Sequence, residues 1–556
     1  MISYGKLEPL APVFSLKIFL AQNKNINKGA DMGVQISLHA SNMVDPAQWE
    51  KAYEESLILV DKFNFIEFQR FNKFEGEYTA AVKSKERECP AGIGWITVGE
   101  GHYLMTAEDF FMPRKIANPK ENENYCDPLM YIYAQNGSID FDNPYVNGLR
   151  SFWGGKTQGA PYHVGLLAIG CLLDDRLNGE VLCSDDITYG QCKHAVEVAN
   201  KILKKKIGMP LRCRMEDLYK RVRKLPIKKE QMLEAFAATY LGIKDEQYYK
   251  FVEEHFSEEE QNFFIKKRMC NRYLGTVGFV DCLQEVLSYN IPIASACSAF
   301  LEMPPENKIL ENGENPFKKF VENILDTNIY LKEKDLRDCL NVDETSGETM
   351  SVEKLMAGFL FYNAHNHSVA RYVPLEDLKE QLVESIGDKC DVGGIIDEYL
   401  NEKDKKQNTG EKDARTNLND WHDRMDKLIA ERRKKYDICD SEHFVFYEKG
   451  NSFVPGILDS LKTGMKFFKD VLEEPQFKEL SEGEYEKKCN FLVSHCRSLK
   501  LMNYTWLRIF EDVKNNPENF KRYYPMARIV VNSEVIHDLL RAYVENDDFY
   551  ELCQGL

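Results

Sequence analysis

Residues 160–203, APYHVGLLAIGCLLDDRLNGEVLCSDDITYGQCKHAVEVANKIL, carry the clearest structural signals of the chain. Residues 160–177 are apolar on nearly every side, which predicts a buried helix that Gly179 closes. Residues 180–183 predict one short strand. Thr188, with Gln191 three positions later, predicts the capped start of an amphipathic helix that ends before Gly208 and Pro210. This order of helix, strand and helix indicates a folded unit of mixed structure.

The first 150 residues predict a different kind of unit. Residues 34–40 alternate between apolar and polar side chains, as a half-buried strand does. Asp45 and Pro46 then provide the N-cap and the first position of a helix. Further strand-like stretches occur at 63–71, 78–84 and 94–98. We expect a mixed α+β domain with a small antiparallel sheet.

The whole chain is predicted to be α+β and rich in helix, with the mixed domain at 1–150. A mainly helical domain with one short strand is expected at 151–340, then a helical segment at 341–400. Residues 401–416, NEKDKKQNTGEKDART, contain no large apolar side chain, which predicts a polar linker or surface loop. Residues 417–556 are expected to form a C-terminal helical domain. A chain of 556 residues is long enough for several domains.

Composition excludes several classes of protein. Aromatic residues reach 12%, which argues against disorder, and a formal net charge of -17 disfavours global attraction to DNA or anionic lipid. The longest apolar stretch, near residues 163–173, is far shorter than the roughly 20 residues that span a bilayer, so no membrane partner is expected. Fifteen cysteines without C-x-x-C spacing predict buried free thiols in the reducing cytoplasm.

A glycine-rich segment, SFWGGKTQGAPYH at 151–163, precedes the first buried helix. Glycines that expose backbone N–H groups, a lysine and a helix N-terminus are together typical of an anion site. A phosphate-binding P-loop is excluded, because Arg150 stands where its first glycine is required. The alternative that we favour is a glycine-rich turn that docks a core helix.

Asp185 and Asp186 stand at the junction between the short strand and the helix that Thr188 caps. Carboxylates at such a junction can bind metal or act as bases, but they also suit the turn before a helix, which we favour. If an active site exists, we expect Lys156, Tyr162 and His163 to converge there with the two aspartates. That site would belong to a hydrolase or a phosphate-handling enzyme.

The histidines give weaker signals. His39 ends the first strand, where a structural role is favoured over a site. His365 and His367 provide two imidazoles, whereas zinc takes three or four protein ligands. The pairs His422-Asp423 and His537-Asp538 are expected on helix surfaces. No sequence motif for a metal or a nucleotide is present, so we predict no metal and no cofactor.

Positive charge is concentrated at 201–229, where twelve Lys or Arg stand against only Glu216 and Asp217. Such a segment could contact nucleic-acid phosphates through Arg221, Arg223 and Lys224, or an acidic protein partner. A solvated helix face, or pairing with acidic runs such as 252–261, is the alternative that we favour.

The sequence leaves three hypotheses for function. The first is a non-catalytic cytosolic protein that binds another protein, such as a bacterial immunity, antitoxin or defence-related protein. The second is the hydrolase or phosphate-handling enzyme with a site at 151–163 and 183–191. The third is nucleic-acid binding through 201–229. The oligomeric state stays open.

Overall fold

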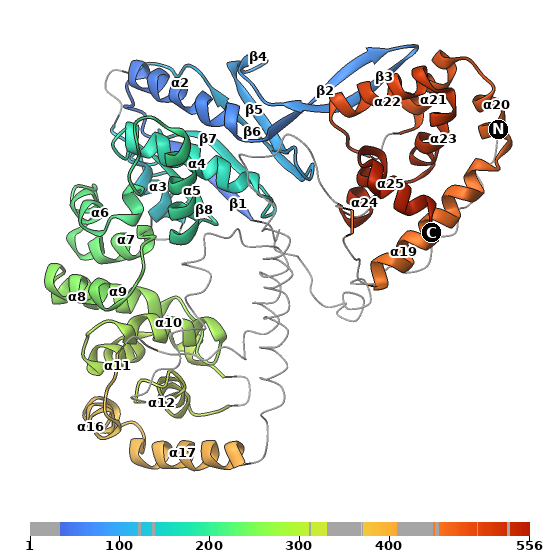
Figure 1. Ribbon diagram of the computed structural model, residues 1–556. Helices are drawn as coiled ribbons and strands as arrows, with labels where there is room; N and C mark the ends of the chain where they lie inside the picture. The colour runs from blue at the N-terminus through green and yellow to red at the C-terminus, as the bar shows by residue number, and fades with distance from the viewer. Residues whose placement is uncertain are drawn as a thin grey trace.

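The computed structural model describes residues 34–120, 124–135, 139–310, 313–330, 369, 371–408, 447, 449–450, 455–496, 499–530 and 534–556 (Figure 1). Two antiparallel sheets near the N-terminus are followed by helices to the end of the chain, which confirms the predicted helix-rich α+β class. In these ranges no helix combines the length and apolar character that crossing a membrane would need.

The first sheet, here called sheet A, has the strand order β7-β1-β8. Its strands are β7 (Arg150–Lys156), β1 (Gln35–Ala40) and β8 (Val181–Asp185). The central strand β1 runs antiparallel to both neighbours, so that Gln35 lies opposite Lys156 on one side and Ile36 lies opposite Asp185 on the other. The two outer strands come from the region beyond residue 149. Sheet A therefore joins residues on both sides of the predicted domain boundary.

One face of sheet A is apolar and is covered by helices. Ile36 and Leu38 belong to one core with the helices α2 (Pro46–Lys62), α4 (Tyr162–Arg176) and α5 (Tyr189–Ile202). The predicted caps form: the Asp45 carboxylate accepts from Gln48 N at 2.8 Å, and Thr188 and Gln191 make a full capping box. The opposite face carries polar side chains and lies against α3 (Pro128–Gln135).

The second sheet, sheet B, has the strand order β3-β2-β5-β4, with β6 paired to β5. Its strands are β2 (Phe65–Lys73), β3 (Gly76–Lys83), β4 (Arg87–Cys89), β5 (Gly92–Glu100) and β6 (Thr106–Pro113). The hairpin of β2 and β3 extends from the sheets to the C-terminal helices (Figure 1). There Tyr78 and Ala80 of β3 join the core of those helices.

A helix stack follows sheet A and is visible as a column in Figure 1. One row is formed by α7, α9, α11 and α16, and a second row by α10, α12 and α17, with each helix contacting its neighbours along the column. The helices of the stack are α6 (Met215–Val222), α7 (Met232–Thr239), α8 (Glu246–His255), α9 (Glu258–Cys270), α10 (Val277–Ser288), α11 (Ile293–Glu302), α12 (Pro316–Asp326), α16 (Leu375–Ile386) and α17 (Val392–Asn408). Short 3-10 turns such as η1 (Leu211–Cys213) connect them.

The polar segment predicted as a linker begins inside α17, because this helix continues to Asn408. Residues 402–407 are Glu, Lys and Gln apart from one aspartate. These residue types are good helix formers even without an apolar face. Residues 409–416 lie outside the described ranges.

The C-terminal helices pack around their own core. They are α19 (Pro455–Leu472), α20 (Pro475–Ser481), α21 (Tyr485–His495), α22 (Asn503–Asn515), α23 (Phe520–Tyr523), α24 (Glu534–Glu545) and α25 (Asp547–Gln554). Arg541 of α24 is fully buried and donates to the carbonyl oxygens of Gly101 and His102 at 3.1 and 2.5 Å. These bonds fix the helices to the turn between β5 and β6.

Candidate functional site

Residues 151–156 of the glycine-rich segment belong to strand β7, and residues 157–161 form the turn that leads into α4, where Gly159 has φ 70°. Side chains of β6 explain Gly155, because a Cβ at this position would lie 3.0 Å from Glu108 Oε2 and 3.1 Å from the Phe110 ring. Only glycine permits β6 to approach the strand so closely. Lys156 ends the strand, and its backbone N–H donates to the Glu108 carboxylate at 2.8 Å. Gly155 thus serves the packing of β7 against β6, and Gly159 serves the turn before α4.

Tyr162 and His163 open α4 and point into the core, where both are fully buried. His163 Nδ1 lies 2.8 Å from Thr157 Oγ1, and burial lowers the pKa of the imidazole to about 4, so the ring is neutral. Burial also raises the pKa of Tyr162. Neither side chain reaches the surface on which the two aspartates lie.

Asp186 is exposed and accepts from Gln35 N at 2.8 Å. Since Lys156 also pairs with Gln35 in the register, the two predicted segments do meet at one end of sheet A. They lie on opposite sides of β1, two strand spacings or roughly 10 Å apart. The structure thus brings Lys156, Asp185 and Asp186 to the same end of sheet A, on its two outer strands and beyond, and sends Tyr162 and His163 into the core.

Asp185 belongs to a polar cluster on the α3 side of sheet A. Its carboxylate accepts from Ser37 Oγ and, at 2.9 Å, from Gln135 Nε2 of α3. Its backbone has φ 73°, a left-handed conformation that is uncommon for a residue other than glycine. The two side-chain hydrogen bonds help to hold this conformation at the end of β8.

His39 is the second member of this cluster. Its Nδ1 lies 2.9 Å from Ser151 Oγ, and its ring centre lies 3.9 Å from that of Tyr131. Burial lowers the pKa of His39 to about 4, although the negative charge of Asp185 opposes this shift. Its Nε2 is buried without a hydrogen-bond partner among the described residues, while Ser151 is exposed. A neutral imidazole therefore lies behind a hydroxyl that solvent reaches.

This pair can share one proton between imidazole and hydroxyl, which is the elementary step that activates a serine. It is not a complete triad, because the Asp185 carboxylate bonds to Ser37 and Gln135 and not to the imidazole. Sequence reasoning named Asp185 and His39 separately and missed Ser151 as their companion. The signal that joins them is the strand register, in which His39 lies opposite Ser151.

Two of the three predicted phosphate contacts in the basic segment at 201–229, Arg221 and Arg223, are paired within the protein. Arg221 contacts Asp127 at 2.6 Å and Glu180 at 2.8 Å. Arg223 pairs with Glu260, in the acidic run predicted as its alternative partner, and stacks on Tyr219 and Phe256. Of the three predicted phosphate contacts, only Lys224 is exposed with no ion pair to any residue in the described ranges. It borders an open cavity of about 280 Å³ beside α6.

The expectation for His537 and Asp538 is wrong, since both are buried in α24. This helix packs against the rest of the C-terminal core, and His537 Nε2 lies 3.1 Å from the carbonyl oxygen of Lys500. The other predicted histidines, His365, His367 and the pair His422-Asp423, lie outside the described residues. Among the residues that are described, no group of three or more His, Cys, Asp and Glu could hold a metal ion.

The helix stack presents an exposed apolar surface, here called the stack patch. It consists of Tyr273, Leu301 and Ile309, which are 61%, 40% and 75% exposed. Leu301 lies at the end of α11, and the loop after α9 runs beside the segment after α11, since Leu274 N donates to Asn307 O at 2.8 Å. Lys308 Nζ in turn donates to Leu301 O at 2.9 Å.

Comparisons with known proteins give no assignment: no family model matches the chain, and neither a curated protein nor a solved structure matches it. Any function proposed for the chain therefore rests on the geometry of the polar cluster and of the stack patch.

Proposed function

We propose that this protein is a non-catalytic binding protein that docks an acidic protein segment on its helix stack. The observation that carries the proposal is the stack patch. Large apolar side chains that are exposed together on a folded protein are typical of interaction sites, whereas single ones are ordinary surface. Rows of helices that contact only their neighbours offer a long surface for such a partner.

The charge around the stack patch favours an acidic partner. Residues 266–275 and 301–310 contain five cationic side chains and two carboxylates, a local net charge of +3 on a chain of net charge -17. Lys266 is already paired with Glu302 and Arg268 with Glu285, but Arg272 is exposed and has no ion pair to the described residues. Complementary charge at the rim of an apolar centre speeds association and fixes orientation.

A cytoplasmic location is part of this proposal. All thirteen cysteines in the described ranges are free thiols, and most are buried. Free thiols in this number suit a reducing compartment.

The experiment is affinity capture with matched variants. Tyr273→Ser/Ile309→Ser removes two large apolar side chains that lie mostly in solvent, so the fold should be kept. Ile58→Ser on α2, which is 45% exposed, is the matched control. A partner with an acidic segment should be recovered by the wild-type and control proteins, lost with the double variant, and weakened by salt. Equal recovery by all three proteins would refute the stack patch as the docking surface.

A second candidate function rests on the contact between Ser151 and His39. Ser151 is exposed and its hydroxyl lies 2.9 Å from a neutral imidazole, an arrangement that suits a serine nucleophile, and the imidazole lies near the negative charge of Asp185. This is the hydrolase alternative with His39 in place of His163. A fluorophosphonate probe should then label Ser151 in the wild type, and His39→Gln should slow the labelling. If mass spectrometry finds Ser151 unmodified, the pair is structural.

A further inference from the structure

The open cavity beside α6 is lined mainly by positive charge. Its volume is about 280 Å³. Four of its seven lining residues are cationic and one is a carboxylate, whereas the whole chain has a net charge of -17. The lining residues are Asn178, Leu211, Arg214, Asp217, Lys220, Arg221 and Lys224. A concave site with this excess of cations favours an anionic ligand.

The cationic side chains gather on one side of α6. The lining residues from Arg214, the N-cap residue, to Lys224 recur every three or four positions. This spacing places side chains on the same side of a helix. Leu218 and Val222, by contrast, are fully buried in the core of the helix stack. The helix therefore turns its cationic side to the cavity and its apolar side to the core.

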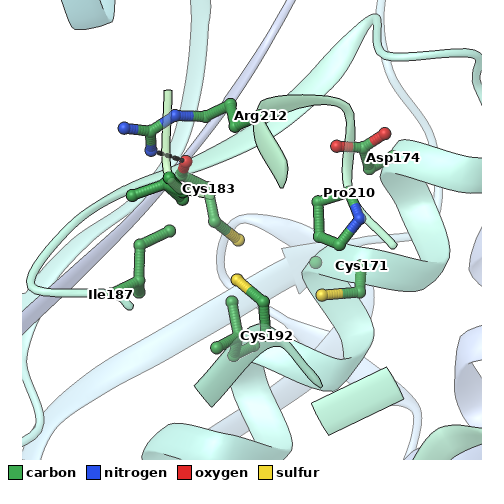
Figure 2. A pocket seen from close by; sticks show the side chains of 10 residues that line it. Cys171, Asp174, Cys183, Ile187, Cys192, Pro210 and Arg212 are labelled. Carbon is green, nitrogen blue, oxygen red and sulfur yellow. Dashed lines mark hydrogen bonds between the residues drawn. The ribbon is translucent and has the colours of Figure 1, made fainter. Parts of the chain in front are cut away.

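The segment that leads into α6 is fixed from within the protein. Leu211 N donates to the Asp174 carboxylate at 3.0 Å. The next residue, Arg212, is buried and donates to the carbonyl oxygen of Cys183 at 2.8 Å, as Figure 2 shows. Gly179 lets Leu211 approach, because a Cβ at residue 179 would lie 2.8 Å from Leu211 Cδ2. This part of the cavity is therefore formed before any ligand binds, which lowers the entropic cost of binding.

The cations of the cavity differ in how far they are already neutralised. Arg221 is paired with two carboxylates, so its charge is balanced within the protein. Lys224 is exposed and has no ion pair to any residue that the structure describes. The side chain of Lys220 is 66% exposed, and its Nζ lies 3.9 Å from each of two carboxylates, too far for a direct hydrogen bond. Lys220 and Lys224 therefore keep ammonium hydrogens for a ligand.

Asp217 is the one carboxylate of the lining, and it is paired with Arg214. Their side chains are 45% and 43% exposed. An ion pair so open to solvent contributes little stability, so a ligand with more negative charge can take the place of Asp217. The guanidinium of Arg214 then presents a planar fork of donors that matches the oxygens of a phosphate group.

We propose that this cavity binds a small ligand with a diphosphate or triphosphate group. Such a group carries several charged oxygens close together, so it can accept from Arg214, Lys220 and Lys224 at once. A volume of about 280 Å³ lies at the lower end of ligand pockets, which run from roughly 300 to 1,000 Å³, and suits a compact group. A nucleic-acid strand would need a longer basic surface, and Arg223 does not extend it because this residue pairs with Glu260.

The site goes beyond the proposed docking function. It uses none of the residues of the stack patch, and a phosphate ligand can bind whether or not a protein partner is present. Its test is therefore independent of the capture experiment.

Isothermal titration calorimetry of the full-length protein with inorganic pyrophosphate tests the site. Lys220→Gln/Lys224→Gln should weaken binding at least about tenfold, because it removes two charged donors. Lys204→Gln/Lys205→Gln removes the same charge from exposed positions of the basic segment that do not line the cavity, and should keep the affinity within about twofold. ADP should bind at least as tightly as pyrophosphate. A tighter complex with ADP would identify a nucleotide as the source of the group, and equal affinity would show that the phosphates alone are recognised.

Asp217→Asn gives a result that a folding defect cannot imitate. It removes the carboxylate that competes for Arg214, so it should strengthen pyrophosphate binding about three- to tenfold. Weaker or unchanged binding by this variant would overturn the proposal, as would a wild-type protein that does not bind pyrophosphate. An equal loss of affinity in the two double lysine variants would also overturn it, since the charge of the whole segment would then attract the ligand without a site.

Discussion

Arg221→Ala separates the internal role of the basic segment from a role in binding phosphates. Arg221 Nε lies 2.6 Å from Asp127 Oδ2, and its Nη2 lies 2.8 Å from Glu180 Oε1. The Asp127 side chain is only 3% exposed and that of Arg221 is 20% exposed. The alanine variant leaves a buried carboxylate next to α3 without its cation.

Breaking a buried ion pair by removing one partner costs about 3–5 kcal/mol. For Arg221→Ala we expect a loss at the lower end of this range, about 3 kcal/mol, because Arg221 keeps some contact with solvent. Lys224→Ala, three residues later and exposed, should change the stability by less than about 0.5 kcal/mol. Asp127→Asn in the Arg221→Ala background should restore part of the loss, since it removes the stranded charge.

The loss should also depend on pH. Burial raises the pKa of Asp127, and Arg221 opposes this shift, so the variant's carboxyl should titrate at a still higher pH. A carboxyl whose pKa is raised by folding stabilises the protein at low pH and loses that contribution as pH rises through the raised pKa. The stability that Arg221→Ala loses relative to the wild type should therefore be smallest in acid and should grow toward neutral pH.

The assay is thermal unfolding across this pH range, paired with fluorescence anisotropy of a labelled oligonucleotide at several salt concentrations. Our reasoning would be refuted if Arg221→Ala were as stable as Lys224→Ala and yet flattened the salt dependence of oligonucleotide binding. That outcome would mean that Arg221 contacts the oligonucleotide phosphates and is not needed for an internal ion pair.

Three further substitutions test the fold. Thr188→Ala removes the cap of α5 and should cost about 1 kcal/mol in thermal unfolding. Gly170→Ala places a methyl against Cys183 Sγ and should cost about 1–3 kcal/mol of stability by overpacking. An unchanged stability would contradict this close packing of α4 on β8. Burial raises the pKa of Glu100 to about 7, so this group's contribution to stability should fall as pH rises from about 4.5 to 7. Glu100→Gln should flatten the dependence of stability on pH in this range. An unchanged dependence would refute the raised pKa of Glu100.

Local signals in the sequence predicted much of the secondary structure. The caps at Asp45 and Thr188 act through residues three positions away, so a single sequence contains all that is needed to predict them. The same holds for α4, whose apolar residues on every side require burial whatever covers them. Residues 151–156 were harder, since their glycines suit a turn, and only the approach of β6 explains them as a strand.

The candidate sites depended on contacts between distant parts of the chain. His39 and Ser151 are 112 residues apart and meet only because β1 pairs with β7. Likewise, the stack patch combines Leu301 of α11 with Tyr273 and Ile309 of the segments after α9 and α11, whose proximity depends on how α9 packs against α11. His537 and Asp538 were expected on a surface, because nothing in their neighbourhood of sequence shows that α24 is buried by the turn after β5.

Hydrogen–deuterium exchange on the complex with the captured partner is the most direct test of the proposed function. We expect slower exchange on binding in the loop after α9 and the segment after α11, at residues 266–275 and 301–310, with little change in the C-terminal helices. Protection confined to the C-terminal helices or to the exposed edge of sheet A, with the stack patch exchanging as in the free protein, would contradict docking on the helix stack.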